Sequence, residues 1–135
     1  MIISKDWVGV ISNLKHSYQK KTNFGLVIYN GNKLEGFIFG DLITIEKILE
    51  YEILLIYVKE ERRNLGYASK LIQSLSSSIK KKKLKKIFLE VAANNKKAIE
   101  LYRKNKFKYL TSRKNYYKDK DKKIDAHLFE KIIYE

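Results

Sequence analysis

The most constraining feature of this sequence lies near its middle, where an apolar, strand-like run leads through a turn with two arginines into a helix-like segment. The run is Tyr51–Val58, and the segment Gly66–Lys80 has apolar residues at helical spacing. The first N–H groups of a helix are unpaired and carry partial positive charge. Because small residues at the helix start let a bulky anion approach those donors, and Arg62 and Arg63 add charge, the junction predicts a phosphate-binding site.

The glycine pattern of this junction limits the kinds of phosphate ligand. Neither the spacing of a Walker loop nor that of a Rossmann fingerprint is present, so nucleotide hydrolysis and dinucleotide binding are not expected. The spacing Arg63-x-x-Gly66-x-Ala68 on its own is also compatible with a purely structural turn. The sequence contains no cysteine, which excludes disulfides, thiolate metal sites and a cysteine nucleophile.

The order of the predicted elements indicates a single domain, residues 1–135, of the mixed α/β (α+β) class. Hairpin strands come first, and a strand–helix–strand–helix–strands order follows, which favours one mixed sheet flanked by helices. The apolar run Tyr51–Val58 is almost uninterrupted and is expected to be buried on both faces. The expected elements are a helix from Ser4 or Asp6 to Tyr18, strands Phe24–Tyr29 and Leu34–Ile43 joined by the turn Asn30-Gly31-Asn32, strand Tyr51–Val58, helix Gly66–Lys80, strand Ile87–Val91, helix Asn94–Lys104, and strands Phe107–Ser112 and Ala126–Ile132.

The formal net charge of +14, from 29 Lys+Arg and 15 Asp+Glu, favours anionic partners such as nucleic acid, the ribosome surface or coenzyme A. A lysine excess that reflects codon bias is the alternative interpretation. The lysine-rich run Lys80–Lys86 fits either a solvated helix end or an RNA contact. No apolar segment reaches membrane-spanning length and no apolar leader is visible, so we expect a soluble, cytoplasmic protein without membrane contact. His16 and His127 are isolated, and no metal site is expected.

Three motifs in the second half of the chain resemble those of the GNAT superfamily of N-acetyltransferases. Residues Arg63–Ala68, which read R-N-L-G-Y-A, match the acyl-CoA pyrophosphate signature Q/R-x-x-G-x-G/A. The stretch Leu89–Phe107 resembles the second motif of that superfamily, in particular the version in bacterial ribosomal-protein-alanine N-acetyltransferases (the RimI type). The R-K-N-Y-Y sequence Arg113–Tyr117, followed by Asp125–Ala126, is similar to the ending of those enzymes and of archaeal N-terminal acetyltransferases. The resemblance extends from about Leu54 to the last residue.

The resemblance implies a GNAT fold, whose mixed, mostly antiparallel sheet splays apart at the acetyl-CoA site. The N-terminal elements are expected to be shortened, with the first strand of the family missing before Trp7. Acetyl-CoA is the implied cofactor, and the acetyl group passes directly to an amine without a covalent acyl-enzyme. Strand-end backbone would align the pantetheine arm, and the turn amides would hold the pyrophosphate. The predicted cofactor-binding residues are Ile56, Val58, Arg62, Arg63, Asn64, Leu65, Gly66, Tyr67, Ala68, Ser69, Asn95 and Tyr102.

The resemblance also assigns catalytic roles. It implies Glu90 as the general base, Tyr102 as the hydroxyl near the thioester sulfur, and Tyr116 and Tyr117 as part of a groove for a peptide substrate. A protein α-amine has a pKa of about 7.7–8.0, so its deprotonation near neutral pH costs about 1 kcal/mol and a modest base suffices. A tyrosine hydroxyl can supply the hydrogen bond that a thiolate leaving group needs. The alternatives are a lysine-paired surface carboxylate at Glu90 and packing roles for the three tyrosines.

Three positions depart from the family pattern. Lys106 stands where a glycine is usual, so that turn is expected to differ in shape, while Ala92 replaces an arginine and Glu60 a proline. The favoured substrate is a protein N-terminal α-amine, and the basic charge suggests a ribosomal protein. A small-molecule amine, a polyamine or a lysine side chain is the alternative acceptor. An interpretation of a different class is a basic RNA- or ribosome-binding module that keeps the fold without activity.

Overall fold

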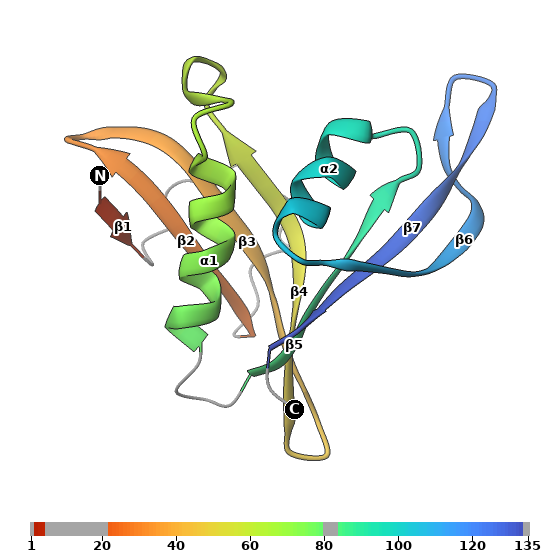
Figure 1. Cartoon of the computed structure of the whole chain (residues 1–135), viewed down its shortest axis with the longest axis horizontal. Coiled ribbons are helices and arrows are strands. Elements are labelled where there is room, and N and C mark those ends of the chain that lie inside the picture. Colours follow the sequence, from red (N-terminus) through yellow and green to blue (C-terminus); the bar gives the residue numbers. More distant parts are fainter. Residues whose placement is uncertain (1, 5–21, 80–83, 134–135) are drawn as a thin grey trace.

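The computed structural model describes residues 2–4, 22–79 and 84–133, and these form a seven-stranded sheet with two helices. The strands follow the order β1-β2-β3-β4-β5-β7-β6, and among neighbours only β4 and β5 run parallel (Figure 1). The predicted class, one mixed and mostly antiparallel sheet with helices, is confirmed. The elements are β1 (Ile2–Ser4), β2 (Asn23–Asn30), β3 (Lys33–Ile45), β4 (Ile48–Val58), α1 (Tyr67–Ile79), β5 (Leu84–Ala92), α2 (Lys96–Lys104), β6 (Lys108–Asp119) and β7 (Lys122–Ile132), with a short helical turn at Glu60–Arg62.

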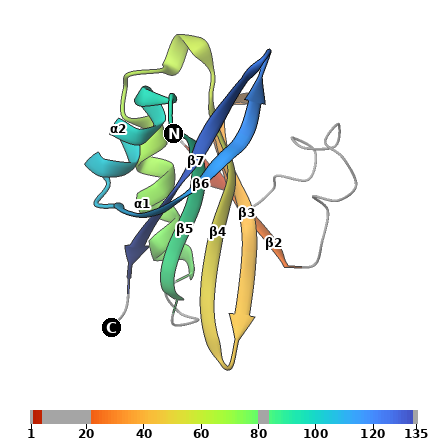
Figure 2. The same ribbon diagram turned by 90° about the vertical axis from the view of Figure 1, so that its right-hand side faces the viewer.

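Both helices cover the same face of the sheet (Figure 2). Helix α1 packs on β2, β3 and β4 through four fully buried side chains, each of which stabilises the fold by about 1.5–3 kcal/mol. Those side chains are Leu71, Ile72, Leu75 and Ile79, at the helical spacing that the sequence predicts. The main hydrophobic core therefore lies between this sheet face and the two helices.

The side chain of Tyr51 in β4 crosses β3 at Gly40 and connects β4 to β2. Tyr51 is fully buried, and its hydroxyl donates a hydrogen bond to the carbonyl oxygen of Phe24 over 2.6 Å. A Cβ at Gly40 would overlap the carbonyl oxygen of Glu52 and lie 2.6 Å from the Tyr51 ring. Glycine is required at this position because the carbonyl oxygen of Glu52 and the ring of Tyr51 occupy the space that any side chain would need.

The N-terminal expectation needs correction. Strand β1 pairs antiparallel with β2, with Ile3 opposite Ile28, so the prediction that no strand precedes Trp7 is wrong. Ser4 is the last residue of this strand. The predicted helix from Asp6 to Tyr18 and most of the lysine-rich run, Lys80–Lys83, lie outside the described residues. In this part of the chain, the structure differs from the prediction by one additional strand of three residues, at the edge of the sheet.

The central hairpin differs from the prediction in length and burial. Strands β3 and β4 extend to a tight turn at Glu46 and Lys47, whose φ values are 50° and 71°. The run Tyr51–Val58 is not buried on both faces, because Leu54 and Tyr57 are 41% and 40% exposed. The cause is the separation of β4 from β5, described below. None of the helices in the described part of the chain is long and apolar enough to cross a membrane.

Candidate active site

The sheet opens between its two parallel strands. Pairing of β4 with β5 runs from Leu49 opposite Leu84 to Ile53 opposite Leu89 and then stops. Beyond that point β4 continues with β3 as its described neighbour, while β5 continues beside β7 (Figure 1). Beyond Ile53 this edge of β4 has no partner strand among the described residues, so its backbone groups can bind a ligand in the way that they would bind an additional strand. The predicted splay is present.

A β-bulge marks the point of divergence. Phe39 of β3 lies opposite Leu55, and Gly40 lies opposite Ile53, so Leu54 has no partner residue in β3. An extra residue of this kind bends its strand and increases the local twist. The bulge therefore turns the end of β4 away from β5 and explains why apolar side chains of this strand become exposed.

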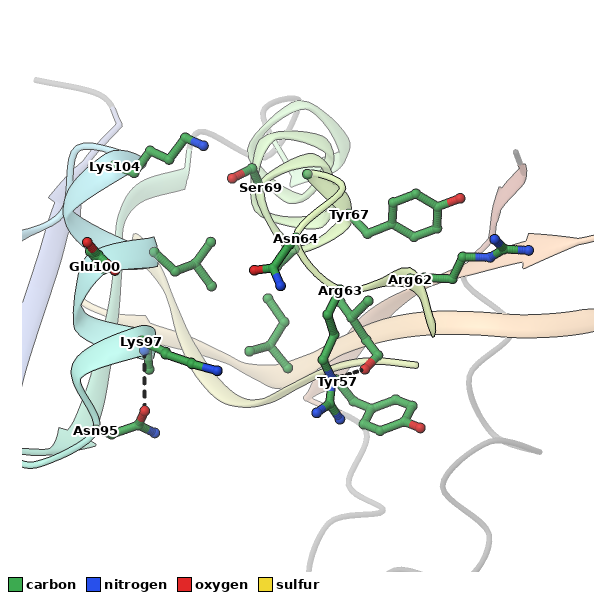
Figure 3. Close-up of a pocket in the computed structure, with 16 residues that line it drawn as sticks. Tyr57, Arg62, Arg63, Asn64, Tyr67, Ser69, Asn95, Lys97, Glu100 and Lys104 are labelled. Carbon is green, nitrogen blue, oxygen red and sulfur yellow. Dashed lines mark hydrogen bonds between the residues drawn. The ribbon is translucent and has the colours of Figure 1, made fainter. Parts of the chain in front are cut away.

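The opening leads into a cleft of about 940 Å³ between the end of β4, the start of α1 and one side of α2. That volume lies in the range of pockets that hold small molecules and cofactors. The cleft brings together ten of the predicted cofactor-binding residues, but neither Leu65, whose side chain is 61% exposed, nor Tyr102 lines it. The lining residues are Ile56, Tyr57, Val58, Arg62, Arg63, Asn64, Gly66, Tyr67, Ala68, Ser69, Asn95, Lys97, Ala98, Glu100, Leu101 and Lys104 (Figure 3).

The N-terminus of α1 forms one wall of the cleft. The first helical hydrogen bond runs from Lys70 N to Gly66 O over 3.0 Å, so the preceding N–H groups have no acceptor within the helix. Gly66 has a φ of +85°, and a Cβ there would meet no atom within 4 Å. The Nε of Arg63 donates to the carbonyl oxygen of Val58 over 2.9 Å and fixes the turn (Figure 3). Free amides, helix dipole and open space together suit a phosphate group.

The charge of the cleft is strongly positive. Arg62 and Arg63 contribute from the turn, and Lys97 and Lys104 contribute from α2 on the opposite wall (Figure 3). Glu100 supplies the one carboxylate among the lining residues. Sequence reasoning did not identify the two lysines, although their seven-residue spacing in a predicted helix places them on one face. A cleft of this charge favours a polyanionic ligand.

Helix α2 is held in place by asparagines at both ends. Asn95 caps its start, because its Oδ1 accepts a hydrogen bond from Ala98 N over 3.2 Å (Figure 3). Asn105 follows its last turn and is only 5% exposed. The Nδ2 of Asn105 donates to the Leu101 carbonyl oxygen over 2.9 Å and to Ser69 Oγ over 3.0 Å. Asn105 therefore ties α2 to the first turn of α1, a role that sequence reasoning missed.

The turn after α2 keeps the shape that a glycine would give. Lys106 N donates to Arg103 O and Phe107 N donates to Tyr102 O, the pattern of a Schellman motif. Lys106 has a φ of +72°, in the left-handed region that glycine adopts without strain. The expectation that the turn differs in shape is therefore wrong. The lysine adopts the glycine-like conformation because both hydrogen bonds require it.

Tyr102 lies in the core beneath α2. It is 6% exposed, and its ring centroid is 5.7 Å from that of Phe107. Burial raises the pKa of Tyr102 to about 12. No hydrogen bond to its hydroxyl is present among the described residues. The side chain therefore combines the predicted packing role with a hydroxyl that keeps its proton at neutral pH.

Glu90 lies on the sheet face opposite the helices. Leu89 and Val91 are buried in the core under the helices, so strand alternation directs Glu90 to the other face. Its Oε1 is 3.1 Å from Nη2 of Arg113, so the carboxylate is ion-paired with an arginine and not with a lysine. Glu90 does not line the cleft. Burial, followed by the nearby charges of Glu90 and Asp41, raises the pKa of Glu52.

The two predicted substrate-groove tyrosines lie near Glu90. Tyr116 and Tyr117 are in edge-to-face contact with ring centroids 5.1 Å apart, and the Arg113 guanidinium lies 5.3 Å from the Tyr116 ring. Burial raises the pKa of Tyr117, with further contributions from Glu90 and Tyr116. The structure therefore groups Glu90 with Tyr117, whereas Tyr102 is on the helix side of the sheet.

The spacing of the third motif has a local explanation. Asn115 has a φ of +55°, and its backbone N–H donates to Oδ1 of Asp125 over 2.9 Å. The β6–β7 register shifts between Arg113 and Tyr117, so this segment is a bulge that Asp125 holds.

Among the described residues, no group of three or more His, Cys, Asp or Glu side chains is arranged to hold a metal ion.

Comparisons with known proteins agree with this geometry. The sequence model of the acetyltransferase (GNAT) family matches residues 5–107. No curated protein sequence matches the chain. The ribosomal-protein-S18-alanine N-acetyltransferase of Escherichia coli is similar in structure, with a TM-score of 0.82 at 22% identity over 99% of this chain and 94% of that chain. The structure of Arabidopsis thaliana Naa50 in complex with the bisubstrate analogue CoA-Ac-MVNAL is also similar. Its TM-score is 0.70 at 25% identity, over 79% of this chain and 71% of that chain. The spermidine/spermine N-acetyltransferase of Vibrio cholerae has a TM-score of 0.78 at 18% identity, over 98% of this chain and 92% of that chain.

Proposed function

Because the chain belongs to the acetyltransferase (GNAT) family, we propose that it transfers the acetyl group of acetyl-CoA to the N-terminal α-amine of a protein. Family membership confirms the predicted enzyme class, and the family uses acetyl-CoA as its acetyl donor. The observation that carries the proposal is the cationic cleft, in which the start of α1 meets the opening of the sheet.

The cleft residues fit the two halves of acetyl-CoA. The unpaired amides at the start of α1, together with Arg63, bind the diphosphate, and Gly66 leaves the space for it. The edge of β4 at Ile56 and Val58, where the Val58 carbonyl oxygen already accepts from Arg63 Nε, pairs through its remaining backbone groups with the amide groups of the pantetheine arm. The Nδ2 of Asn95 is the donor that remains for a ligand after its Oδ1 has capped α2. Bound acetyl-CoA supplies the acetyl group as an activated thioester.

The amine approaches from the sheet face that carries Glu90. An amine attacks a thioester only in its neutral form, and Glu90, directly or through a water molecule, takes the proton from the ammonium group. The pKa of an α-amine is about 7.7–8.0, so this step requires only about 1 kcal/mol near neutral pH. Tyr102 is protonated at neutral pH, burial raises its pKa further to about 12, and its hydroxyl stabilises the departing sulfur. Tyr116 and Tyr117 provide aromatic surface for the substrate beside Glu90.

The choice of a protein N-terminus follows the chemistry of this face and the similar structures. An apolar aromatic pair beside one ion-paired base suits a peptide end, and two of the similar structures are an alanine N-acetyltransferase and an enzyme in complex with a peptidyl-CoA analogue. A polyamine is the second candidate, because Asp41, Glu52 and Glu90 place three carboxylates near one another. A cytoplasmic location, proximity to the ribosome and RNA contacts remain predictions from the sequence.

Two measurements test the proposal. Isothermal titration with acetyl-CoA is expected to show saturable binding that is lost in Gly66→Glu, because a carboxylate would then stand at the diphosphate site. Release of CoA thiol is then measured with peptides that begin with Ala, Ser or Met, with the same peptides acetylated at the N-terminus, and with spermidine. Turnover of free-amine peptides alone supports the proposal, whereas turnover of spermidine alone favours the polyamine candidate. Absence of acetyl-CoA binding at millimolar concentration contradicts both.

A further inference from the structure

A buried carboxylate stands directly behind the phosphate-binding turn. Glu35, in β3, is only 1% exposed, and its Oε2 lies 3.2 Å from Nε of Arg62. A buried charge is costly unless an opposite charge accompanies it, so the arginine accounts for the presence of the carboxylate. The contact is an ion pair without hydrogen-bond geometry, since neither Glu35 Oε2 nor Arg62 Nε has a hydrogen-bond partner among the described residues. Each of these two atoms therefore depends on the other.

The backbone of Glu35 also holds the turn. Lys59 N donates to the Glu35 carbonyl oxygen over 2.8 Å, and Arg62 N donates to the Lys59 carbonyl oxygen over 2.8 Å. The short helical turn Glu60–Arg62 is thereby attached to β3 at both ends, once by a backbone hydrogen bond and once by the ion pair. The residues that follow immediately are those of the α1 N-terminus.

The direction of the Arg62 side chain distinguishes its role from that of Arg63. In Figure 3 the Arg62 guanidinium points away from the centre of the cleft. Arg63 instead returns to the end of β4, where its Nε donates to Val58 O. Arg62 thus attaches the turn to β3, on the side away from the centre of the cleft.

We propose that Glu35 is a positioning residue, which sets the conformation of the diphosphate-binding turn through Arg62. The inference rests on the proposed function, because it assumes that this turn binds the diphosphate of acetyl-CoA. A carboxylate close to a polyanion site weakens anion binding through its charge alone. The carboxylate of Glu35 therefore makes its contribution through geometry, by holding the turn amides where the phosphate oxygens meet them.

The charge effect and the positioning effect have opposite signs, which makes a clear experiment possible. If Glu35 acted only through its charge, Glu35→Gln would bind acetyl-CoA more tightly. If it positions the turn, Glu35→Gln binds acetyl-CoA less tightly, by about 10- to 100-fold, as displacements of about 1 Å in a binding site can produce. The matched control is Glu61→Gln, which removes the same charge from the same turn. It breaks an exposed ion pair of 3.8 Å with Lys59, and its acetyl-CoA affinity is expected to be unchanged or slightly higher.

A second substrate separates positioning from general damage to the fold. Acetyl-pantetheine carries the thioester but lacks the diphosphate, so Glu35→Gln is expected to retain wild-type kcat/KM with it while KM for acetyl-CoA rises and kcat changes little. If Glu35→Gln fails to fold, the conservative variant Glu35→Asp keeps the negative charge but shortens the side chain that reaches Arg62, and it is expected to give the same selective loss. Equal or tighter acetyl-CoA binding by these variants overturns the inference, as does an equal loss with both substrates. If the wild type itself shows no saturable acetyl-CoA binding, the proposed function fails and this inference fails with it.

Discussion

Replacement of Lys106 by glycine is expected to stabilise the protein. Lys106 has a φ of +72° in the Schellman turn after α2, and the left-handed conformation costs an L-residue about 1–2 kcal/mol. Glycine avoids that cost but loses about 0.5–1 kcal/mol more backbone entropy on folding than alanine does. Lys106→Gly is therefore expected to have a free energy of unfolding about 0.5–1 kcal/mol higher than Lys106→Ala.

The alanine variant is the proper reference because it removes the same amine from the C-terminal end of the helix. Both variants lose any favourable interaction of the lysine with the helix dipole, and only the backbone conformation then distinguishes them. Urea unfolding followed by circular dichroism gives the free energies of unfolding. The slope of unfolding free energy against urea concentration is expected to be equal in the two variants. A midpoint temperature about 2–4 °C higher for the glycine variant should accompany the change. If Lys106→Ala proves as stable as Lys106→Gly, the left-handed strain inferred at this turn is refuted.

Three further predictions concern the site. Glu90→Gln is expected to lower kcat at pH 7 by about 100-fold without weakening acetyl-CoA binding. The kcat of this variant should recover partly at pH 9, because the substrate amine then loses its proton without a base. An unchanged kcat at pH 7 would exclude Glu90 as the base. Because burial raises the pKa of Tyr102 from 10.0 to about 12, its stabilising effect is complete below pH 10 and is lost as the pH rises towards 12. Tyr102→Phe should therefore show a shallower fall in unfolding free energy between pH 10 and 12, by up to about 1.4 kcal/mol per pH unit, in urea titrations. Gly66→Ala should lose about 1–2 kcal/mol of stability and bind acetyl-CoA more weakly in calorimetry, whereas Gly31→Ala, also at positive φ in open space, should lose stability alone.

Local patterns allowed much of the fold and one wall of the site to be predicted. The segment from Arg63 to Ser69 is continuous in sequence, so the strand–turn–helix pattern places its amides together without knowledge of the tertiary structure. Asn95, which only the family resemblance indicated, caps a predicted helix and lines the same cleft, while its contact with the cofactor stays a prediction. Alternation along β5 correctly placed Glu90 on the face opposite Leu89 and Val91.

The features that were missed depend on contacts between distant segments. The Glu35–Arg62 pair and the Asn105–Ser69 hydrogen bond each join elements whose relative position is fixed only by strand register and helix packing. The Arg113–Glu90 pair likewise requires β7 to lie between β5 and β6. Exposure of Leu54 could not be foreseen, because its apolar neighbours predict burial, whereas the bulge that exposes it arises from pairing with β3.

The parting of β4 from β5 has a mechanical consequence. It divides the described residues into one half with β1–β4 and α1 and another with β5–β7 and α2, joined within the sheet by a pairing that ends at Ile53. The cleft lies along this seam and is lined by residues of both halves, so a ligand bound in it contacts both halves and connects them. A free ligand concentration of 100 times Kd stabilises the binding state by about 2.7 kcal/mol relative to a state that does not bind the ligand, such as one in which the two halves have moved apart. Under the proposed function, bound acetyl-CoA would therefore make the protein more rigid, and amide exchange along the seam would measure that effect.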